Sequence, residues 1–241
     1  MSTWIVCPYP RAHPKLRLLC FAYAGGSAWI FRTWAKQLPN TIELCAIELP
    51  GRGKRIAEPA LKQVSSIVEN LGPELLPYLN VPFACFGHSL GALVAFELCR
   101  WLRYTTQLNP YHFWVSAAQA PHLPATVSPM HTLPETEFIN ELKRYKGTPT
   151  SILNNAEMMA LVLPTLRADF TVLETYHYQP SEPLNCPITG FWGQQDTIIS
   201  QSEVAAWHIH TQDFSLKAID GDHFFMQQPS FIKRLLPQLT L

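Results

Sequence analysis

Residues 87–91 read G-H-S-L-G and place one serine, Ser89, between two glycines. The apolar run 83–87 precedes the turn, and residues 90–104 follow it with apolar side chains at helical spacing. A serine on such a strand-to-helix turn adopts a normally unfavourable backbone conformation, in which flanking side chains would collide with their surroundings. The G-x-S-x-G pattern in this context is typical of a nucleophile elbow. We therefore predict that Ser89 is a catalytic nucleophile.

A serine hydroxyl is a weak nucleophile and needs a general base. Where this elbow occurs, the chain order is serine, then acid, then histidine. Of the nine histidines, His223 fits best, because it lies in the glycine-containing turn I-D-G-D-H-F-F-M after the last predicted strand. His208 and His210 lie in A-A-W-H-I-H-T-Q, which is typical of a helix end, and we expect both to be exposed polar residues. His223 is the predicted base.

The base needs a carboxylate that orients its ring and stabilises the protonated form. Asp196 ends F-W-G-Q-Q-D, a predicted strand followed by a glycine and a short loop, and it is the leading candidate. Asp222 is adjacent to His223 and can hardly turn back onto the ring. Asp169, in the segment L-R-A-D-F, is a weaker alternative. The predicted triad is therefore Ser89, His223 and Asp196.

The tetrahedral intermediate of such a triad needs two donors for its oxyanion. The first predicted donor is the backbone N–H of Leu90, which follows the nucleophile at a helix N-terminus. The glycine-rich segment A-Y-A-G-G-S at 22–27 follows an early strand, and few side chains there hinder the approach of a substrate. We assign the second donor to Ala24, with Gly25 as the alternative. A plain turn is the competing interpretation of A-G-G.

The elements that must position these residues alternate along the chain. Apolar runs predict strands at 16–23, 42–49, 83–87, 112–119, 187–193 and 213–220. Helical periodicity appears at 28–38, 60–79, 90–104 and 229–239. Continuous apolar strands separated by helices indicate an α/β fold with a mostly parallel sheet and helices on both faces. The length of 241 residues fits one such domain over 1–241.

Almost seventy residues separate the strand ending near Ala120 from the strand starting near Ile188, more than a crossover helix needs. We interpret residues of about 122–180 as a helical insertion that forms a lid over the active edge of the sheet. Its apolar side chains are expected either to line an acyl pocket or simply to pack on the domain. The candidates are Met158, Met159, Leu161, Val162 and Phe170.

Composition excludes several other classes of protein. The formal net charge is zero, which argues against a nucleic-acid binder. The chain has no apolar stretch long enough to predict a membrane span. Its six cysteines lack metal-finger spacing and mostly lie in apolar runs, as expected of reduced thiols in a cytoplasmic protein. We predict neither a metal nor a cofactor.

The chain resembles the stand-alone type II thioesterases that accompany non-ribosomal peptide and polyketide synthases, within the α/β-hydrolase superfamily. The related medium-chain acyl thioesterases share the pattern. The segments that carry the resemblance are A-Y-A-G-G-S (22–27), I-E-L-P-G-R-G-K-R-I-A-E-P (47–59), F-G-H-S-L-G-A-L-V-A-F-E-L (86–98), L-P-T-L-R-A-D-F-T-V-L-E-T-Y-H-Y (163–178), P-I-T-G-F-W-G-Q-Q-D (187–196) and G-D-H-F-F-M (221–226). Many relatives have proline and histidine where this chain has Ala22 and Tyr23, a departure that bears on the pocket entrance.

The resemblance implies an α/β-hydrolase fold and hydrolysis of acyl thioesters on the phosphopantetheine arm of carrier proteins, with an acyl-serine intermediate. It places Ser89, Asp196 and His223 where the family has its triad, and it implies no cofactor. Arg52, Lys54 and Arg55 cluster in one loop. We expect them either to contact an acidic carrier or the phosphate of its arm, or to form an ordinary solvated face.

Four other functions use the same features. A general carboxylesterase or lipase would use the same triad on an oxygen ester. A medium-chain fatty acyl thioesterase would use it on a fatty acyl thioester. A non-catalytic scaffold that binds synthases would not need Ser89. A cyclising or acyl-transferring enzyme would replace water with another nucleophile. The acyl-chain preference and the partner synthase leave no signal in the sequence.

Overall fold

One mixed, mostly parallel sheet organises the molecule. The computed structural model describes residues 2–124 and 129–239. Within these ranges seven strands form a single sheet in the order β1-β3-β2-β4-β5-β6-β7. The strands are β1 (Ile5–Val6), β2 (Leu16–Phe21), β3 (Ile42–Ile47), β4 (Phe83–His88), β5 (Phe113–Ser116), β6 (Ile188–Gly193) and β7 (Phe214–Ile219). Only β1 among these is antiparallel to its neighbour. The predicted α/β fold is confirmed; the two-residue β1 was not predicted.

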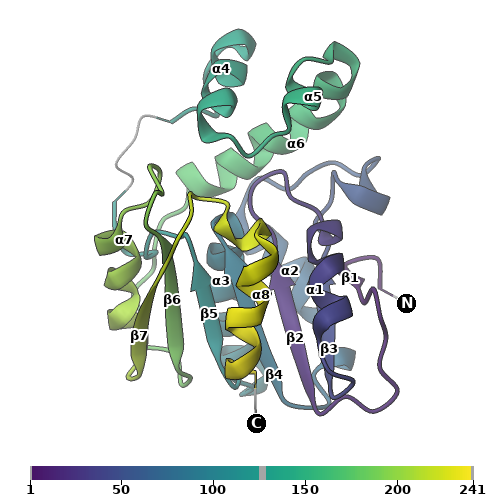
Figure 1. Ribbon diagram of the computed structural model, residues 1–241, viewed down its shortest axis with the longest axis vertical. Coiled ribbons are helices and arrows are strands. Elements are labelled where there is room, and N and C mark those ends of the chain that lie inside the picture. The colour runs from purple at the N-terminus through teal and green to yellow at the C-terminus, as the bar shows by residue number, and fades with distance from the viewer. Residues whose placement is uncertain (1, 125–128, 240–241) are drawn as a thin grey trace.

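Helices cover both faces of this sheet (Figure 1). The face with α1 (Arg32–Gln37) and α8 (Pro229–Leu235) buries strand residues such as Leu18 and Phe86. The opposite face, with α2 (Val64–Leu75) and α3 (Leu90–Thr106), buries the alternate residues, such as Leu19 and Cys85. Side chains of a strand alternate between its faces, so strands buried on both sides are continuously apolar. The remaining body elements are α7 (Gln201–Ala205), η1 (Ala28–Phe31), η2 (Gly53–Arg55), η3 (Leu76–Tyr78), η4 (Ala206–His210), η5 (Phe225–Gln227) and η6 (Leu236–Gln238).

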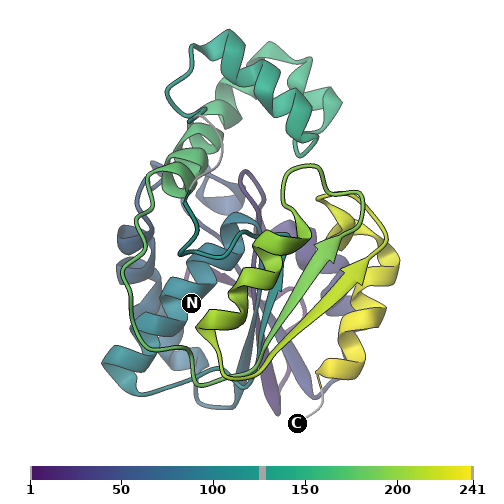
Figure 2. The same ribbon diagram turned by 90° about the vertical axis from the view of Figure 1, so that its left-hand side faces the viewer.

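The segment between β5 and β6 contains three further helices: α4 (Glu135–Tyr145), α5 (Thr150–Leu153) and α6 (Ala156–Glu174). They stand together on one end of the body (Figure 2). They bury an apolar cluster of their own, built mainly by α4 and α6, which includes Phe138 and Phe170. Of the predicted insertion, residues 125–128 lie outside the described residues, as do residues 1, 240 and 241 of the predicted domain.

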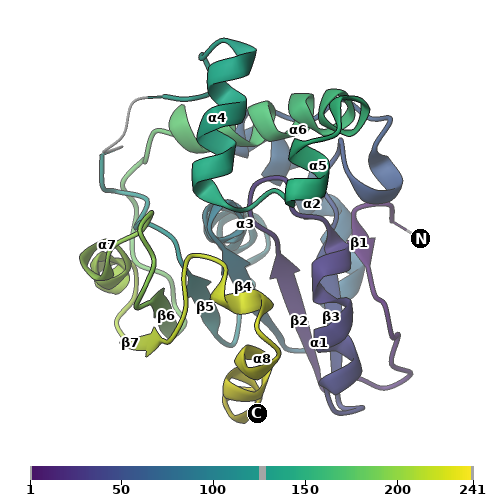
Figure 3. The same cartoon turned by 45° about the horizontal axis from the view of Figure 1, so that its top comes forward.

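Strands β2, β4, β5, β6 and β7 are parallel, so their carboxyl ends share one edge of the sheet, which the insertion overlies (Figure 3). Ligands of open α/β sheets bind at this edge. In the described part of the chain, no helix is both long and apolar enough to cross a membrane.

Candidate active site

Ser89 occupies a strained turn between β4 and α3. Its backbone angles are φ 53° and ψ −119°, and it is the N-cap residue of α3. A positive φ is unusual for a residue with a side chain and requires support from its surroundings. Here the Ser89 N–H donates to the Ser116 carbonyl at 2.9 Å, and the Ser89 carbonyl accepts from the Ala92 N–H at 2.9 Å. The two bonds hold the turn from both sides.

The flanking glycines have the steric role expected of an elbow. A Cβ on Gly87 would lie 2.5 Å from Ala92 Cα, and a Cβ on Gly91 would lie 2.2 Å from the Phe21 carbonyl oxygen. Both contacts are with backbone, which cannot move aside as a flexible side chain can. Glycine therefore allows α3 to start directly against β2 with Ser89 at the carboxyl edge.

His223 and Asp196 meet at the same edge. His223 Nδ1 and Asp196 Oδ2 are 2.8 Å apart, and the two side chains are 6% and 0% exposed. The other carboxylate oxygen, Oδ1, accepts from the backbone N–H groups of Ile198 (2.8 Å) and Ile199 (3.0 Å). The carboxylate is thus fixed by the loop after β6, and it engages Nδ1 of the ring. This leaves Nε2 as the atom able to take a proton from a nucleophile.

The ring of His223 packs against His88, the residue that precedes Ser89 in the elbow. The His88 and His223 ring centroids are 5.3 Å apart. Ser89 Oγ and His223 Nε2 form no hydrogen bond within the described residues. In the absence of substrate this contact is commonly long and tightens on binding. The contact between His223 and Asp196 is therefore formed in this structure, whereas the contact between Ser89 and His223 is not.

The glycine-rich loop after β2 distinguishes between the two candidates for the second oxyanion donor. The Gly25 N–H donates to Asp169 Oδ2 at 2.6 Å and is therefore already engaged. That bond leaves the neighbouring Ala24 N–H as the better candidate. The first candidate, the Leu90 N–H, belongs to the opening turn of α3, whose N–H groups have no partner within the helix.

A buried ion pair that sequence reasoning missed supports this loop. Asp169 on α6 accepts two bonds from the Arg52 guanidinium, at 2.7 and 2.8 Å, and the side chains of Asp169 and Arg52 are 1% and 7% exposed. Glu48, also buried, accepts from the Ala28 N–H at 3.1 Å. Burial raises the pKa of Glu48, and the nearby Arg52 opposes that shift. The loop at 25–28 is therefore held at both ends by carboxylates.

The expected carrier contact is corrected for two of its three residues. Arg52 is buried against Asp169. Arg55 is also buried: its guanidinium lies over the Trp4 ring at 3.9 Å and pairs with Glu58. Lys54 is exposed. The loop turns its arginines inward because they satisfy buried acceptors, and it does not present a cluster of three charges to a partner. Asp169, the weaker alternative for the acid, is engaged by Arg52 instead of His223.

His88 is a second residue that sequence reasoning did not place in the site. It is completely buried, and its Nδ1 lies 2.9 Å from Ser116 Oγ. Burial, with a smaller contribution from His223, lowers its pKa well below the usual value, so the ring is neutral. It packs edge-on against Tyr23 and Phe225. Its position at the end of a buried strand, just before the nucleophile, is the signal that could have identified it.

The apolar candidates of the insertion divide into two groups. Met159 and Phe170 are buried in the cluster of the insertion itself, and Val162 packs on it. Met158 and Leu161 are 41% and 54% exposed. The cluster reaches the glycine-rich loop at 22–27, because Ala24 packs on it and a Cβ at Gly25 would lie 2.5 Å from the side chain of Leu166. Leu166 was not among the predicted residues, although it lies on the same helix.

One group of side chains offers metal-ligand atoms within the described part of the chain. It comprises Cys7, Glu43 and Cys45. Glu43 and Cys45 lie on β3, away from the carboxyl ends of β4 and β6 where the elbow and Asp196 are found. The residues around Ser89 are those of acid–base and nucleophilic chemistry.

Comparison with known proteins places the chain in a family. The family model described as the thioesterase domain matches residues 16–239. The gramicidin S biosynthesis protein GrsT of Aneurinibacillus migulanus is 42% identical over 100% of this chain and 95% of its own length. Thioesterase PikA5 of Streptomyces venezuelae is 37% identical over 92% and 80% of the two chains. The type II thioesterase BorB from the borrelidin biosynthetic cluster superposes with a TM-score of 0.90 at 31% identity, covering 99% and 98% of the two chains. The chain therefore belongs to the thioesterase domain family and is a hydrolase of thioesters.

Proposed function

We propose that this enzyme releases acyl groups from the phosphopantetheine arms of carrier proteins in non-ribosomal peptide or polyketide synthases. Removal of stalled or wrongly loaded acyl groups would return the carriers to use. The observation that carries the proposal is the 2.8 Å contact between His223 and Asp196 beside the Ser89 elbow. Support for the substrate class comes from relatives such as GrsT and PikA5, since the former is by name a gramicidin S biosynthesis protein and the latter a thioesterase.

In the proposed mechanism, Ser89 attacks the thioester carbonyl while His223 Nε2 accepts its proton. Asp196 holds the ring in the required tautomer and stabilises the imidazolium. The N–H groups of Leu90 and Ala24 donate to the oxyanion. The thiolate leaves with little acid assistance, because the pKa of a thiol is about 8.5. It then takes up the proton from His223, which makes the ring neutral again. His223 then activates a water, which attacks the acyl-serine and releases a carboxylic acid.

We further propose that the helical insertion acts as a lid over this site. Its buried cluster borders the oxyanion loop at Ala24, so an acyl chain directed from Ser89 toward the insertion would meet apolar side chains. Met159 and Phe170 become accessible to substrate only if the helices of the insertion separate, whereas Val162 is already partly exposed. Met158 and Leu161 already face solvent and are better placed for contact with a partner than with an acyl chain. We retain Lys54 as the carrier contact in this loop.

A cytoplasmic location is part of the proposal. All six cysteines are free thiols, five of them buried, which fits a reducing compartment.

The decisive experiment incubates the enzyme with a panel of acyl-loaded carrier proteins and with oxygen esters of the same acyl groups. We expect free acid from the carrier thioesters, and loss of this activity in Ser89→Ala with an unchanged melting temperature. A clear preference for the oxygen esters would indicate a general esterase. Full retention of function by Ser89→Ala would indicate a scaffold.

A further inference from the structure

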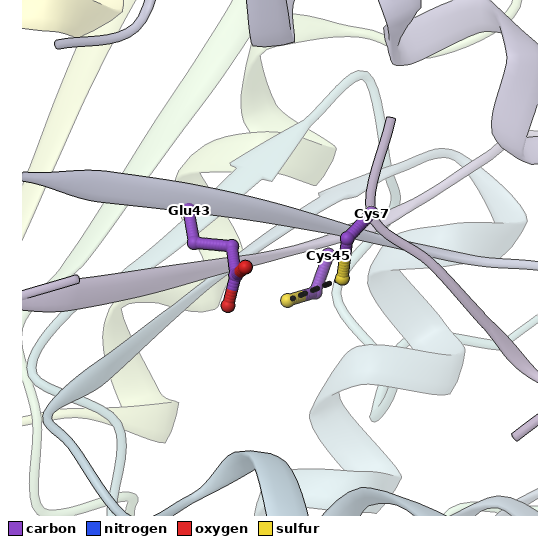
Figure 4. Close-up of side chains that lie close together, drawn as sticks. All are labelled: Cys7, Glu43 and Cys45. Atoms are coloured by element: carbon purple, nitrogen blue, oxygen red, sulfur yellow. Dashed lines mark hydrogen bonds between the residues drawn. The ribbon is translucent and has the colours of Figure 1, made fainter. Parts of the chain in front are cut away.

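Two thiols face each other at the β1 edge of the sheet. Cys7 directly follows β1, and Cys45 lies within β3. Their Sγ atoms are 3.4 Å apart (Figure 4). Cys45 is fully buried, whereas Cys7 is partly exposed. The pair therefore combines one sulfur that a small reagent can reach with a second sulfur directly behind it.

The backbone register suits a covalent bond between them. Ile5 pairs with Ile47 and Val6 with Ala46, so continuing the register by one residue places Cys7 opposite Cys45. The Glu48 N–H donates to the Trp4 carbonyl at 2.8 Å, which makes 4–48 a hydrogen-bonded pair and 7–45, by alternation, a non-hydrogen-bonded one. Cα atoms of such pairs are about 4.5 Å apart. Disulfides span Cα distances of about 4.4–6.8 Å.

The electrostatics distinguish the two sulfurs. A hydrogen bond with Cys45 lowers the pKa of Cys7, an effect opposed by burial and by Glu43 and aided by Arg17. The same interaction, together with burial, raises the pKa of Cys45. Cys7 is therefore the sulfur that ionises first, with the Cys45 S–H donating to its thiolate. A partly exposed thiolate is the reactive form toward oxidants.

Glu43 completes the group in Figure 4 but is not free to bind a metal. It lies two residues from Cys45 on the same face of β3. Its Oε2 accepts from Arg17 Nε at 2.6 Å, and its Oε1 accepts from the Arg11 N–H at 2.9 Å. A metal ion would have to displace both donors and then lie beside a guanidinium. The group is better suited to thiol chemistry than to metal binding.

We propose that Cys7 and Cys45 form a reversible oxidation site that takes hydroperoxides as its reactant. The Cys7 thiolate attacks the peroxide O–O bond, which yields a sulfenic acid on Cys7 and releases hydroxide from hydrogen peroxide or an alkoxide from an organic hydroperoxide. The Cys45 thiol then attacks the sulfenic sulfur, which forms the S–S bond and releases water. A dithiol reductant returns two electrons and two protons and restores both thiols.

The disulfide would link the segment after β1, at the edge of the sheet, covalently to β3. Trp4, on the same segment, packs under Arg55 of the loop that also contains Arg52. Oxidation restricts the unfolded chain and so raises the melting temperature, by about 5–10 °C. The site is separate from Ser89, so the reduced and oxidised enzymes retain the triad.

The test titrates the reduced full-length chain with hydrogen peroxide and follows intact mass, non-reducing peptide maps and melting temperature. We expect loss of two hydrogen masses, a linked Cys7–Cys45 peptide, the rise in melting temperature, and reversal of all three by dithiothreitol. Cys7→Ser should abolish these changes. Cys99→Ser is the matched control, because Cys99 lies 3.7 Å from Cys85 in a pair that is buried on both sides.

Several outcomes would overturn the proposal. One is irreversible oxidation of Cys7 without a linked peptide. Another is a Cys85–Cys99 bond that forms at the same peroxide concentration. A third is stoichiometric retention of zinc by the reduced chain in native mass spectrometry, which would assign a metal site instead. The peptide map of the unsubstituted chain decides between these outcomes even if Cys7→Ser does not fold.

Discussion

Replacement of Asp169 by asparagine would test whether the buried ion pair supports the oxyanion loop. Asp169 accepts from the Gly25 N–H at 2.6 Å and from Arg52 at 2.7 and 2.8 Å. Asp169→Asn preserves the size of the side chain and one acceptor oxygen but removes its charge. Arg52 is then left buried without its partner, since the two side chains are only 7% and 1% exposed.

The magnitude follows from this burial. Breaking a buried pair from one side costs about 3–5 kcal/mol of the free energy of unfolding. For a chain of this size, each kcal/mol lowers the melting temperature by about 2–4 °C, so we expect a decrease of at least about 6 °C. Loss of an oxyanion donor costs about 10²–10³ in kcat. Because Ala24 is displaced and not removed, we expect a decrease in kcat of about 10–100-fold with little change in KM.

The assay combines thermal unfolding with steady-state hydrolysis of an acyl-pantetheine thioester. Glu141→Gln is the control, because it removes the charge from a carboxylate whose partner, Arg144, is exposed, and it should alter neither readout appreciably. The double variant Arg52→Met/Asp169→Leu removes both charges and should recover most of the stability but not the kcat. An Asp169→Asn enzyme with wild-type melting temperature and wild-type kcat would refute the reasoning.

Three further predictions concern other parts of the molecule. Asp196→Asn presents an amide N–H to His223 Nδ1, which favours the tautomer unable to accept a proton; kcat should decrease by about 10²–10⁴ in thioester hydrolysis, whereas unaltered turnover would exclude Asp196 as the acid. Burial and the neighbouring His122 lower the pKa of His210 from 6.5 to about 4. The folded chain therefore binds fewer protons than the unfolded chain in this window, and the free energy of unfolding should decrease as pH falls from 6.5 toward 4. The decrease is at most about 3 kcal/mol, and solvent screening reduces it. Urea titrations at several pH values measure it. If the free energy of unfolding of His210→Phe depended on pH as steeply as that of the parent, His210 would not be the group responsible. Gly91→Ala brings a Cβ within 2.2 Å of a β2 carbonyl, so we expect a large loss of stability in denaturant titrations, and a variant as stable as the parent would show that α3 can shift.

The exposure of His210 was predicted wrongly from the local sequence pattern. The segment A-A-W-H-I-H-T-Q predicts an exposed helix end, and His208 is indeed exposed. His210 is 2% exposed instead, because its ring packs against Phe96 and Trp207 and its Nε2 lies 3.0 Å from His122 Nδ1. Trp207 belongs to η4 as His210 does, but Phe96 on α3 and His122 come from distant segments, and local periodicity does not predict those contacts.

The sequence by itself determined the features whose cause is local. The elbow around Ser89 can be recognised in the sequence because glycine is needed on both sides of the serine: at Gly87 to avoid the first turn of α3, and at Gly91 to avoid the neighbouring strand β2. The strands can be predicted from the sequence because a strand that is buried on both faces is a continuous apolar run. The order of Ser89, Asp196 and His223 along the chain follows from the same topology.

Tertiary structure alone decided which charged and sulfur-containing side chains meet. Arg52 and Asp169 are 117 residues apart, and their pairing buries a charge that was expected at the surface and fixes the loop at Gly25. Cys7 and Cys45 are brought together by a two-residue strand too short to be predicted. Such contacts depend on the register and packing of distant segments, and charge or thiol character at one position carries no information about the partner it will find.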